Sequence, residues 1–316
     1  MTLSRTDEPR YYGQVYKSNS LIQMAQYTLT HNEMRLLVYL ISKISRGDNV
    51  NKKYQITIQE AADVMNVDIN SGGTYYKFMR DAVKKLCLRE WGIMPGGKMS
   101  TISWLLDAEV APGQGVIDFY FHPKMQPFLF DIKEKYTQYK LSEILSMETS
   151  AAMRLFELMK SVCIKNKGLD GQYVIKRTIR EYSLDDLRLQ LGIQDKYPKW
   201  SDLDRYAIRK SVDNINSISE EMHVEYMPIK TGRSVTSVRF IIDAPDAEQL
   251  LLVQETMAKR ENRKQNSKAS AQKSARRASN TSMATYSEKP DELFYILTDN
   301  EEDTEALKDW LSDLPK

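Results

Sequence analysis

Two stretches of this chain repeat the same order of hydrophobic and polar positions. Each begins with apolar residues at helical spacing behind a hydroxyl residue suited to cap a helix, Thr30 in one stretch and Thr149 in the other. A short second helix follows behind Thr57 and Ser183, and an acidic residue three positions later resembles a capping box. Both short helices end at a turn-forming residue followed by an apolar one. This pattern is typical of the first half of a helix-turn-helix.

A longer amphipathic helix is predicted after each turn, over Tyr75–Leu88 and Trp200–Ile218. The positions expected to face inward are Met79, Val83 and Leu86 in the first and Leu203, Ala207, Ser211, Ile215 and Ile218 in the second. The other face carries Lys77, Arg80 and Lys84 in the first and Lys199, Ser201, Arg205 and Arg209 in the second.

Each long helix is followed by two strand-like runs joined by a tight turn, 91–94 with 100–106 and 223–228 with 235–242. Basic residues lie at the tips, Lys98 in the first hairpin and Lys230 and Arg233 in the second. A helix, a helix-turn-helix and a hairpin make a winged helix. We therefore predict an α+β fold, mainly helical, with two tandem winged-helix domains plus a flexible C-terminal extension.

This arrangement suits DNA for a geometric reason. A major groove about 12 Å wide admits one α-helix, whose basic outer face then meets base edges and flanking phosphates. A basic hairpin tip reaches phosphates beside the groove. Winged helices also serve as protein-docking modules, and a cationic helix face is often simply solvated. Two units in tandem with a basic tail behind them favour DNA over both alternatives.

The charge distribution supports this interpretation. The chain has 316 residues, enough for two domains, with 45 basic and 43 acidic side chains. Residues 1–254 hold 34 basic and 31 acidic side chains, 255–290 hold 9 and 3, and 291–316 hold 2 and 9. A near-neutral body is thus followed by a basic stretch and an acidic end. The basic stretch has few large apolar side chains, so we expect it to be disordered or a frayed helical extension from Pro245.

Several functions are disfavoured by what the sequence lacks. Its three histidines are far apart in the chain and form no metal-binding pair, and there is no phosphate loop or nucleophile elbow. Two cysteines fit a reducing compartment and make neither a disulfide framework nor a zinc site alone. No apolar run is long enough to span a bilayer, and the first residues lack a signal peptide's apolar stretch. We expect a cytoplasmic, nucleoid- or plasmid-associated protein that is not an enzyme and needs no metal or cofactor.

The spaced residues of both halves resemble the theta-type, iteron-binding plasmid replication initiators. The resemblance covers residues 15–245. The matching positions are Ser20-Leu21-Ile22, Ala25, Tyr27, Leu29-Thr30, Glu33, Arg35-Leu36-Leu37 and Ile41-Ser42, then Phe121, Pro123, Pro127-Phe128-Leu129 and Tyr139-Lys140-Leu141, then Arg154-Leu155-Phe156-Glu157-Leu158, Trp200-Ser201-Asp202-Leu203-Asp204-Arg205 and Ile215-Asn216.

The resemblance implies an initiator that binds direct repeats at an origin as a monomer. As a homodimer it would bind an inverted repeat at its own promoter and repress it. Its partners would be duplex DNA, a second copy of itself, the host replication initiator and replicative helicase, and chaperones that assist dimer-to-monomer conversion. Lys199, Ser201, Arg205 and Arg209 would then read a groove or bind phosphate, and Lys77, Arg80 and Lys84 would mostly contact phosphate. Lys98, Lys230 and Arg233 would belong to the wings.

We therefore predict five segments: a flexible N-terminal arm (1–17), winged-helix domain 1 for dimerisation and backbone contact (18–135), winged-helix domain 2 for repeat recognition (136–254), a basic linker (255–290) and an acidic amphipathic end (291–316). In the last, Leu307, Trp310, Leu311 and Leu314 make an apolar stripe. This segment is either a docking helix for a host protein such as a helicase or sliding clamp, or it packs on the body and shields the basic groove.

Three alternative functions remain open. A tandem winged-helix transcription repressor would need neither direct repeats nor a helicase. A rolling-circle nicking enzyme would need a metal site and a covalent tyrosine linkage to DNA, and the missing histidine pair disfavours it. A protein-docking adaptor would show no salt-dependent binding to DNA.

Overall fold

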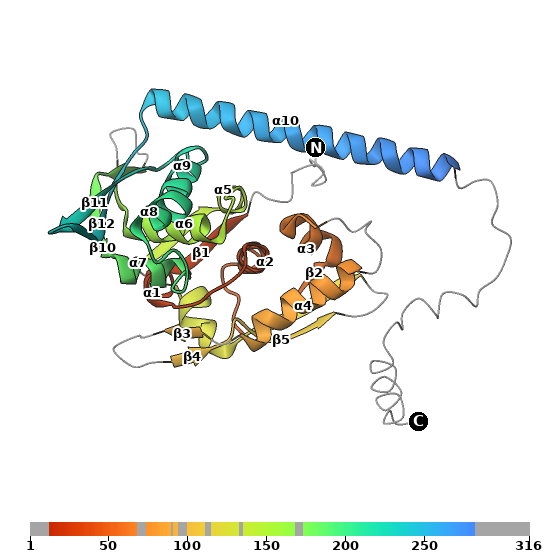
Figure 1. Ribbon diagram of the computed structural model, residues 1–316. Coiled ribbons are helices and arrows are strands. Elements are labelled where there is room, and N and C mark those ends of the chain that lie inside the picture. Colours follow the sequence, from red (N-terminus) through yellow and green to blue (C-terminus); the bar gives the residue numbers. More distant parts are fainter. Residues whose placement is uncertain are drawn as a thin grey trace. The chain divides into compact units, whose positions relative to one another are not determined.

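The computed structural model describes residues 13–67, 74–89, 91–93, 100–110, 115–132, 135–167 and 173–281 (Figure 1). The chain divides into two compact units, 1–257 and 258–316. The first unit contains both predicted domains. Within the described residues, no helix is both long enough and apolar enough to cross a membrane.

The first half of the larger unit is a helix-turn-helix with sheets beside it. Its helices are α2 (His31–Ile41), α3 (Ile58–Met65) and α4 (Thr74–Leu88). A three-stranded antiparallel sheet in the order β2-β6-β5 is formed by Tyr54–Thr57, Val116–Phe121 and Leu105–Val110, and a short hairpin pairs β3 (Trp91–Ile93) with β4 (Ser100–Ile102).

Local sequence explains where these helices begin and end. Thr30 and Thr57 each accept a hydrogen bond from the backbone amide three residues on, and Glu33 and Glu60 accept one from the cap residue's own amide. Both predicted caps are therefore present, each as a full capping box. Asn66 ends α3 in the left-handed conformation at φ 56°, which asparagine tolerates better than most residues.

The first hairpin differs from its prediction. The run predicted as one strand over 100–106 is divided, because β4 ends at Ile102 and β5 starts at Leu105, where it pairs with β6 instead of β3. Between them Trp104 turns into the core and is fully buried, with its ring stacked 4.5 Å from that of Trp91. Burying this large ring interrupts the strand.

The second half repeats the arrangement. Its elements are α5 (Leu141–Leu145), α6 (Ser150–Val162), the β8–β9 hairpin (Ile164–Lys167 and Tyr173–Lys176), β10 (Thr178–Ser183), α7 (Leu184–Leu191), α8 (Trp200–Asp202), a π-helical stretch η4 (Leu203–Arg209), α9 (Lys210–Asn216), β11 (His223–Thr231) and β12 (Ser234–Asp243). The sheet order is β10-β12-β11. Thr149 and Ser183 cap α6 and α7 as predicted, and Gly192 ends α7 at φ 68°.

The N-terminal segment is folded as far back as residue 14, contrary to the arm predicted over 1–17. β1 (Gln14–Ser18) pairs antiparallel with β7 (Tyr136–Lys140), and α1 (Asn19–Met24) follows it. Val15 and Lys17 are buried, so this strand is part of the core. The pairing also crosses the boundary predicted at 135/136, since one strand comes from each side of it. Short helical turns, η2 (Pro123–Met125) and η3 (Gln126–Phe130), lie between β6 and β7.

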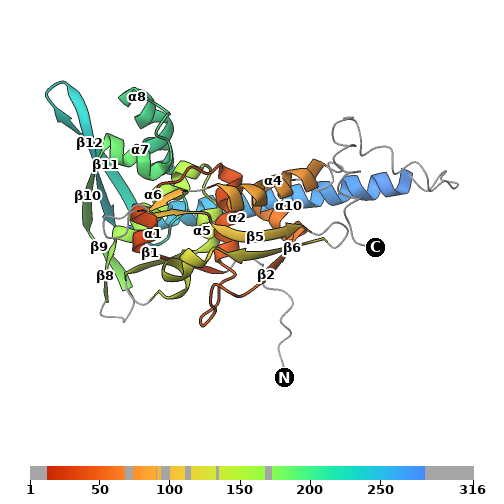
Figure 2. The same ribbon diagram turned by 90° about the horizontal axis from the view of Figure 1, so that it is seen from below.

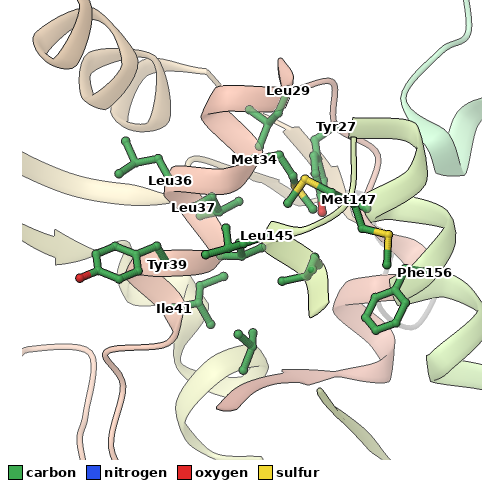
Figure 3. Packing of buried hydrophobic residues seen from close by; sticks show 14 of the residues in the cluster. Tyr27, Leu29, Met34, Leu36, Leu37, Tyr39, Ile41, Leu145, Met147 and Phe156 are labelled. Atoms are coloured by element: carbon green, nitrogen blue, oxygen red, sulfur yellow. The ribbon is translucent and has the colours of Figure 1, made fainter. Parts of the chain in front are cut away.

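A single hydrophobic cluster joins the two halves. α2 contacts α3 and α4 of its own half and also α5 and α6. In Figure 3, Met34 and Leu37 of α2 face Leu145 and Met147, and Phe156 of α6 lies beyond them. The two winged helices therefore share buried apolar surface, which stabilises each against the other.

The helix after the second sheet, α10, runs over Ala247–Thr281. Val253 is fully buried and Met257 packs against the core, so the start of α10 belongs to the first unit. Residues 258–281 belong to the second unit and are helical, which agrees with the expected helical extension from Pro245 and differs from the alternative of a disordered linker. The acidic amphipathic segment 291–316 lies outside the described residues.

Candidate nucleic-acid interface

The long helix of the second half presents a cationic outer face. Its inner positions are those predicted: Leu203, Ala207, Ser211, Ile215 and Ile218 are all at most 1% exposed. Ser201, Arg205 and Arg209 are exposed along the other face, and Lys199 is exposed at the start of the helix. The helix lies beside the β11–β12 hairpin, which extends beyond the body in Figure 2. All four predicted side chains are therefore accessible to a ligand, and their contact with DNA stays a prediction.

Arg209 is exposed and is also connected to the wing through Asp204. Its Nη2 donates to Asp204 Oδ2 at 2.7 Å, and the Tyr226 hydroxyl of β11 donates to the other oxygen of Asp204 at 2.5 Å. Hydrogen bonding with Tyr226 and the negative charge of Asp204 raise the pKa of Arg209 above its ordinary value. Asp204 and Arg209 are five residues apart, the spacing of hydrogen bonds in the widened π-helical turn. This triad fixes the helix to β11.

Arg205 has a different environment. Its guanidinium carbon lies 5.6 Å from the centre of the Tyr206 ring, within range of a cation–π interaction. Tyr206 and Lys210 are also exposed on this helix, and neither was among the residues predicted from the sequence. Lys210 could have been found, because it follows Tyr206 by one helical turn and continues the polar face.

The turn that precedes this helix is fastened to α7. Arg188 Nη2 donates to the carbonyl oxygens of Tyr197 at 3.2 Å and Pro198 at 3.3 Å. Tyr197 has a positive φ of 55°, which costs free energy for a tyrosine. These bonds fix the direction in which the chain enters the helix at Lys199.

The corresponding helix of the first half, α4, also exposes cations. Lys77, Arg80 and Lys84 are exposed, as predicted, and Met79, Val83 and Leu86 are at most 2% exposed. Two further basic residues, Lys85 and Arg89, form ion pairs of 3.3 and 3.0 Å with the buried Glu33 of α2. They anchor α4 to α2, so two of the basic residues near the end of α4 are paired with a carboxylate of the protein although both side chains are partly exposed.

The two wings are described to different extents. Lys230 and Arg233 are exposed at the β11–β12 tip, and Gly232 between them has φ 63°. These strands are longer than predicted, which carries the tip further from the body. Lys98, predicted at the tip of the first wing, lies outside the described residues.

A buried cluster of charged and phenolic side chains, which we call the interdomain cluster, connects the two halves. It contains Lys17, Tyr27, Tyr139, Arg154 and Glu157, all at most 6% exposed. Lys17 Nζ lies 2.7 Å from Glu157 Oε1, the Tyr139 hydroxyl donates to the same oxygen, and Arg154 donates to the Tyr27 hydroxyl at 2.7 Å. Burial alone would raise the pKa of Glu157, but Lys17 and Arg154 lower it, so the carboxylate is charged.

Arg154 extends this cluster to α1 in the first half and to α7 in the second. It donates to the carbonyl oxygens of Ile22 and Ala25 in the first half and to that of Gln190 on α7. Gln190 in turn donates to the carbonyl of Gln23 at 2.6 Å. The sequence offered Arg154 and Glu157 as spaced motif residues but gave no sign of this function, because partners such as Lys17 and Ile22 lie more than 100 positions away.

Comparison with known proteins agrees with this architecture. Residues 14–160 match the family described as "Initiator Replication protein, WH1", and residues 183–242 match "Initiator Rep protein, WH2". The chain belongs to the replication initiator family. The predicted fold of two tandem winged-helix domains is thereby confirmed, as is the family that the spaced residues indicated.

Two similar proteins support the assignment of this initiator. A "Replication initiation protein" of Escherichia coli is 22% identical over 234 residues, which are 72% of this chain and 69% of that protein. The crystal structure of the Pi initiator protein in complex with iteron DNA aligns with a TM-score of 0.57 at 14% identity, covering 75% of this chain and all of the other. At that identity the second match concerns the fold.

The described residues contain no group of three or more histidine, cysteine, aspartate or glutamate side chains placed to hold a metal ion. The polar side chains brought together on the outer helices are instead mostly cationic. Such a surface is complementary to a polyanion.

Proposed function

We propose that this initiator binds directly repeated duplex sequences, iterons, at a plasmid origin and starts replication there. The observation that supports this best is that both halves present an exposed cationic helix on a helix-turn-helix scaffold. Helices of this kind enter the major groove of DNA. The similarity to the Pi initiator, which was crystallised on iteron DNA, supports the same function.

The two helices are suited to different contacts. In the second half, Arg205 has a planar fork that matches the two acceptors of a guanine edge, and the Asp204–Arg209–Tyr226 triad keeps its helix rigid. In the first half the exposed cations of α4 are mainly lysines, which act as point charges toward phosphate. We therefore propose that the second domain reads sequence and that the first domain adds affinity.

The test uses the full chain and duplexes that carry the direct repeats found next to its gene. We expect tight binding to the repeats and weaker binding to a duplex of the same composition in scrambled order. Combined replacement of Lys77, Arg80 and Lys84 by alanine should weaken binding to both duplexes. Lys52→Ala with Lys53→Ala, which removes two exposed charges next to β2, is the control and should have little effect. Equal affinity for repeats and scrambled duplex would contradict the proposal.

We propose in addition that the chain dimerises and represses its own promoter. A monomer bound to direct repeats and a homodimer bound to an inverted repeat at its own promoter would let one chain both start replication and limit its own synthesis. Sedimentation of the chain with each DNA should give one protomer per direct repeat and two per inverted repeat. The same stoichiometry on both would contradict this division, and a repressor without an initiation role would bind the promoter site alone.

Host proteins are the remaining partners that we propose: the host replication initiator, the replicative helicase and chaperones that favour the monomer. The segment after Met257 is a candidate tether for the helicase. Because Val253 and Met257 pack on the first unit, a chain ending at Met257 keeps that unit complete. It should bind iterons normally and fail to support replication in cells. Normal plasmid replication by the shortened chain would dispose of this docking function.

We further propose that the initiator acts in the cytoplasm, on plasmid DNA, without enzymatic activity or cofactor. Incubation of the chain with supercoiled plasmid and a divalent metal should leave the plasmid intact. Nicked product that carries covalently attached protein would instead identify a rolling-circle enzyme.

A further inference from the structure

An aromatic stack lies on the exposed face of the second cationic helix. The Tyr206 ring centre lies 5.9 Å from that of Tyr197, and the two planes are inclined by 26°. Tyr206 is 51% exposed, whereas Tyr197 is partly buried and packs on the hydrophobic core. The Tyr206 ring is therefore supported by Tyr197 and lies 5.6 Å from the guanidinium carbon of Arg205, and about half of its surface remains exposed.

The backbone under this stack adopts a costly conformation. Tyr197 has a positive φ, which costs free energy in a residue with a side chain. The two hydrogen bonds from Arg188 to the carbonyls of Tyr197 and Pro198 stabilise it. Backbone strain that its surroundings maintain is commonest at functional sites. Here its consequence is to place the Tyr197 ring beneath Tyr206.

Filling the core does not explain Tyr206, since half of its surface remains in solvent. Nor is it needed to bind phosphate, because Lys199, Arg205 and Arg209 supply charge on the same helix. An apolar ring among those cations instead matches the one strongly apolar group on the floor of the major groove, the 5-methyl group of thymine. The ring is rigid with few rotatable bonds, so little entropy is lost when it makes such a contact.

We infer that Tyr206, supported by Tyr197, is a specificity-determining residue that recognises a thymine through its 5-methyl group. The inference rests on the proposed function, because it requires the second helix to enter the major groove. Arg205 beside it would then contact a neighbouring base pair or phosphate, and the tyrosine would add a preference for thymine at one position of the repeat.

The chain contains a matched control for this stack. Tyr16 on β1 and Tyr136 on β7 have ring centres 6.1 Å apart and are 40% and 47% exposed. They form a similar exposed pair outside the two cationic helices. Tyr136→Ala therefore removes a comparable ring without touching the proposed contact.

The experiment begins with duplexes that the full wild-type chain selects from a random pool, so that the protein itself defines the bound sequence. Each thymine of that sequence is then replaced singly by uracil, which removes only the methyl group. For the wild type and for Tyr136→Ala, one replacement should weaken binding about four-fold, the equivalent of the ~0.8 kcal/mol of one buried methylene-sized group. For Tyr206→Ala the same replacement should have no effect, and Tyr206→Phe should keep the wild-type response because the ring remains.

The outcomes separate the two proposals. If the wild type enriches no sequence from the pool, the proposed function fails and the thymine contact fails with it. If a sequence is enriched but no thymine is sensitive to uracil, or if Tyr206→Ala retains the sensitivity, the inference alone is overturned. A uniform loss of affinity in Tyr206→Ala with an intact uracil response would also overturn it, and would make the ring a support for Arg205. Thermal unfolding of each variant checks that the fold is unchanged.

Discussion

Three arginine side chains of the second half act in three different ways in this protein. Arg205 lies on the surface over an aromatic ring, Arg209 is bonded to a carboxylate beside the wing, and Arg154 is buried between the two halves. Periodicity predicts that the first two face outward. It does not predict which of them is already paired within the protein. The Asp204 carboxylate that pairs with Arg209 is also bonded by Tyr226, which lies on a strand 22 residues further along the chain.

Because Arg209 is already paired with Asp204, Arg205 is the better candidate for contacting a base. We expect Arg205→Ala to weaken repeat binding by about 1–3 kcal/mol and to relax preference at one base pair, as loss of a bidentate contact does. Lys84→Ala should cost less and affect all sequences alike, since a phosphate contact carries no base information. Fluorescence anisotropy with the repeat and its single-base variants measures both. A footprint unchanged in position and affinity would remove Arg205 from the interface.

Neutralising the carboxylate of the interdomain cluster should cause a large loss of stability. Glu157→Gln should lower the free energy of unfolding by about 3–5 kcal/mol, because it leaves buried cations unpaired. The control is Glu220→Gln, whose pair with Lys140 is half exposed; its removal should cost less than about 1 kcal/mol. Urea unfolding followed by circular dichroism gives both values, and similar losses for the two variants would contradict the buried pairing.

The lowered pKa of Glu157 also gives this cluster a pH dependence. A carboxyl whose pKa is lower in the folded than in the unfolded chain stabilises the fold fully above its ordinary pKa of about 4.3. That contribution is lost as the pH falls below this value through the folded pKa. We expect the wild type to lose more stability than Glu157→Gln on acidification from about pH 5 to about pH 3, measured by urea unfolding at each pH. Parallel losses in the two chains would show that another group dominates.

At the scale of elements, two glycines with positive φ lie in turns that have different surroundings. Gly192 ends α7 with φ 68°, and a β-carbon added there would lie 2.6 Å from the carbonyl oxygen of Tyr27 in the other half. Gly232 at the wing tip has a similar φ of 63° but open space around it. The first glycine serves both the turn and the contact between the halves, whereas the second serves only the turn.

These two glycines predict different costs for the same substitution. Gly232→Ala should destabilise the chain by about 1–2 kcal/mol, the cost of the left-handed conformation. Gly192→Ala should cost more, because the carbonyl of Tyr27 is backbone and must move as well. Thermal unfolding of both variants under one buffer condition measures the difference. Equal melting temperatures would mean that the approach of the two halves is looser than the structure describes.

At the scale of the whole molecule, two cationic helices belong to one compact unit with a shared core. If both reach DNA, the number of neutralised phosphates is set by the two domains together. With about six to ten such contacts, affinity for duplex DNA should fall by about 10³–10⁵ between 50 and 200 mM salt. Removing Lys77, Arg80 and Lys84 should reduce the slope of log affinity against log salt by roughly one for each lost phosphate contact. A slope that does not change would mean that α4 stays off the DNA.

Local sequence was sufficient to determine the helices, their caps and the outer cationic faces. Hydroxyl caps, helical spacing and turn residues act within a few positions, so the amphipathic helices and the repeat of the winged helix were predictable. The split of the first hairpin and the folded β1 strand were not, since Trp104 and Val15 are placed by burial against distant residues. Only the tertiary structure decided which cations are engaged, that Arg154 and Glu157 join the halves, and that Tyr206 rests on Tyr197. Each depends on groups distant in the chain that are brought together when the shared core excludes water, and local sequence patterns do not predict such contacts.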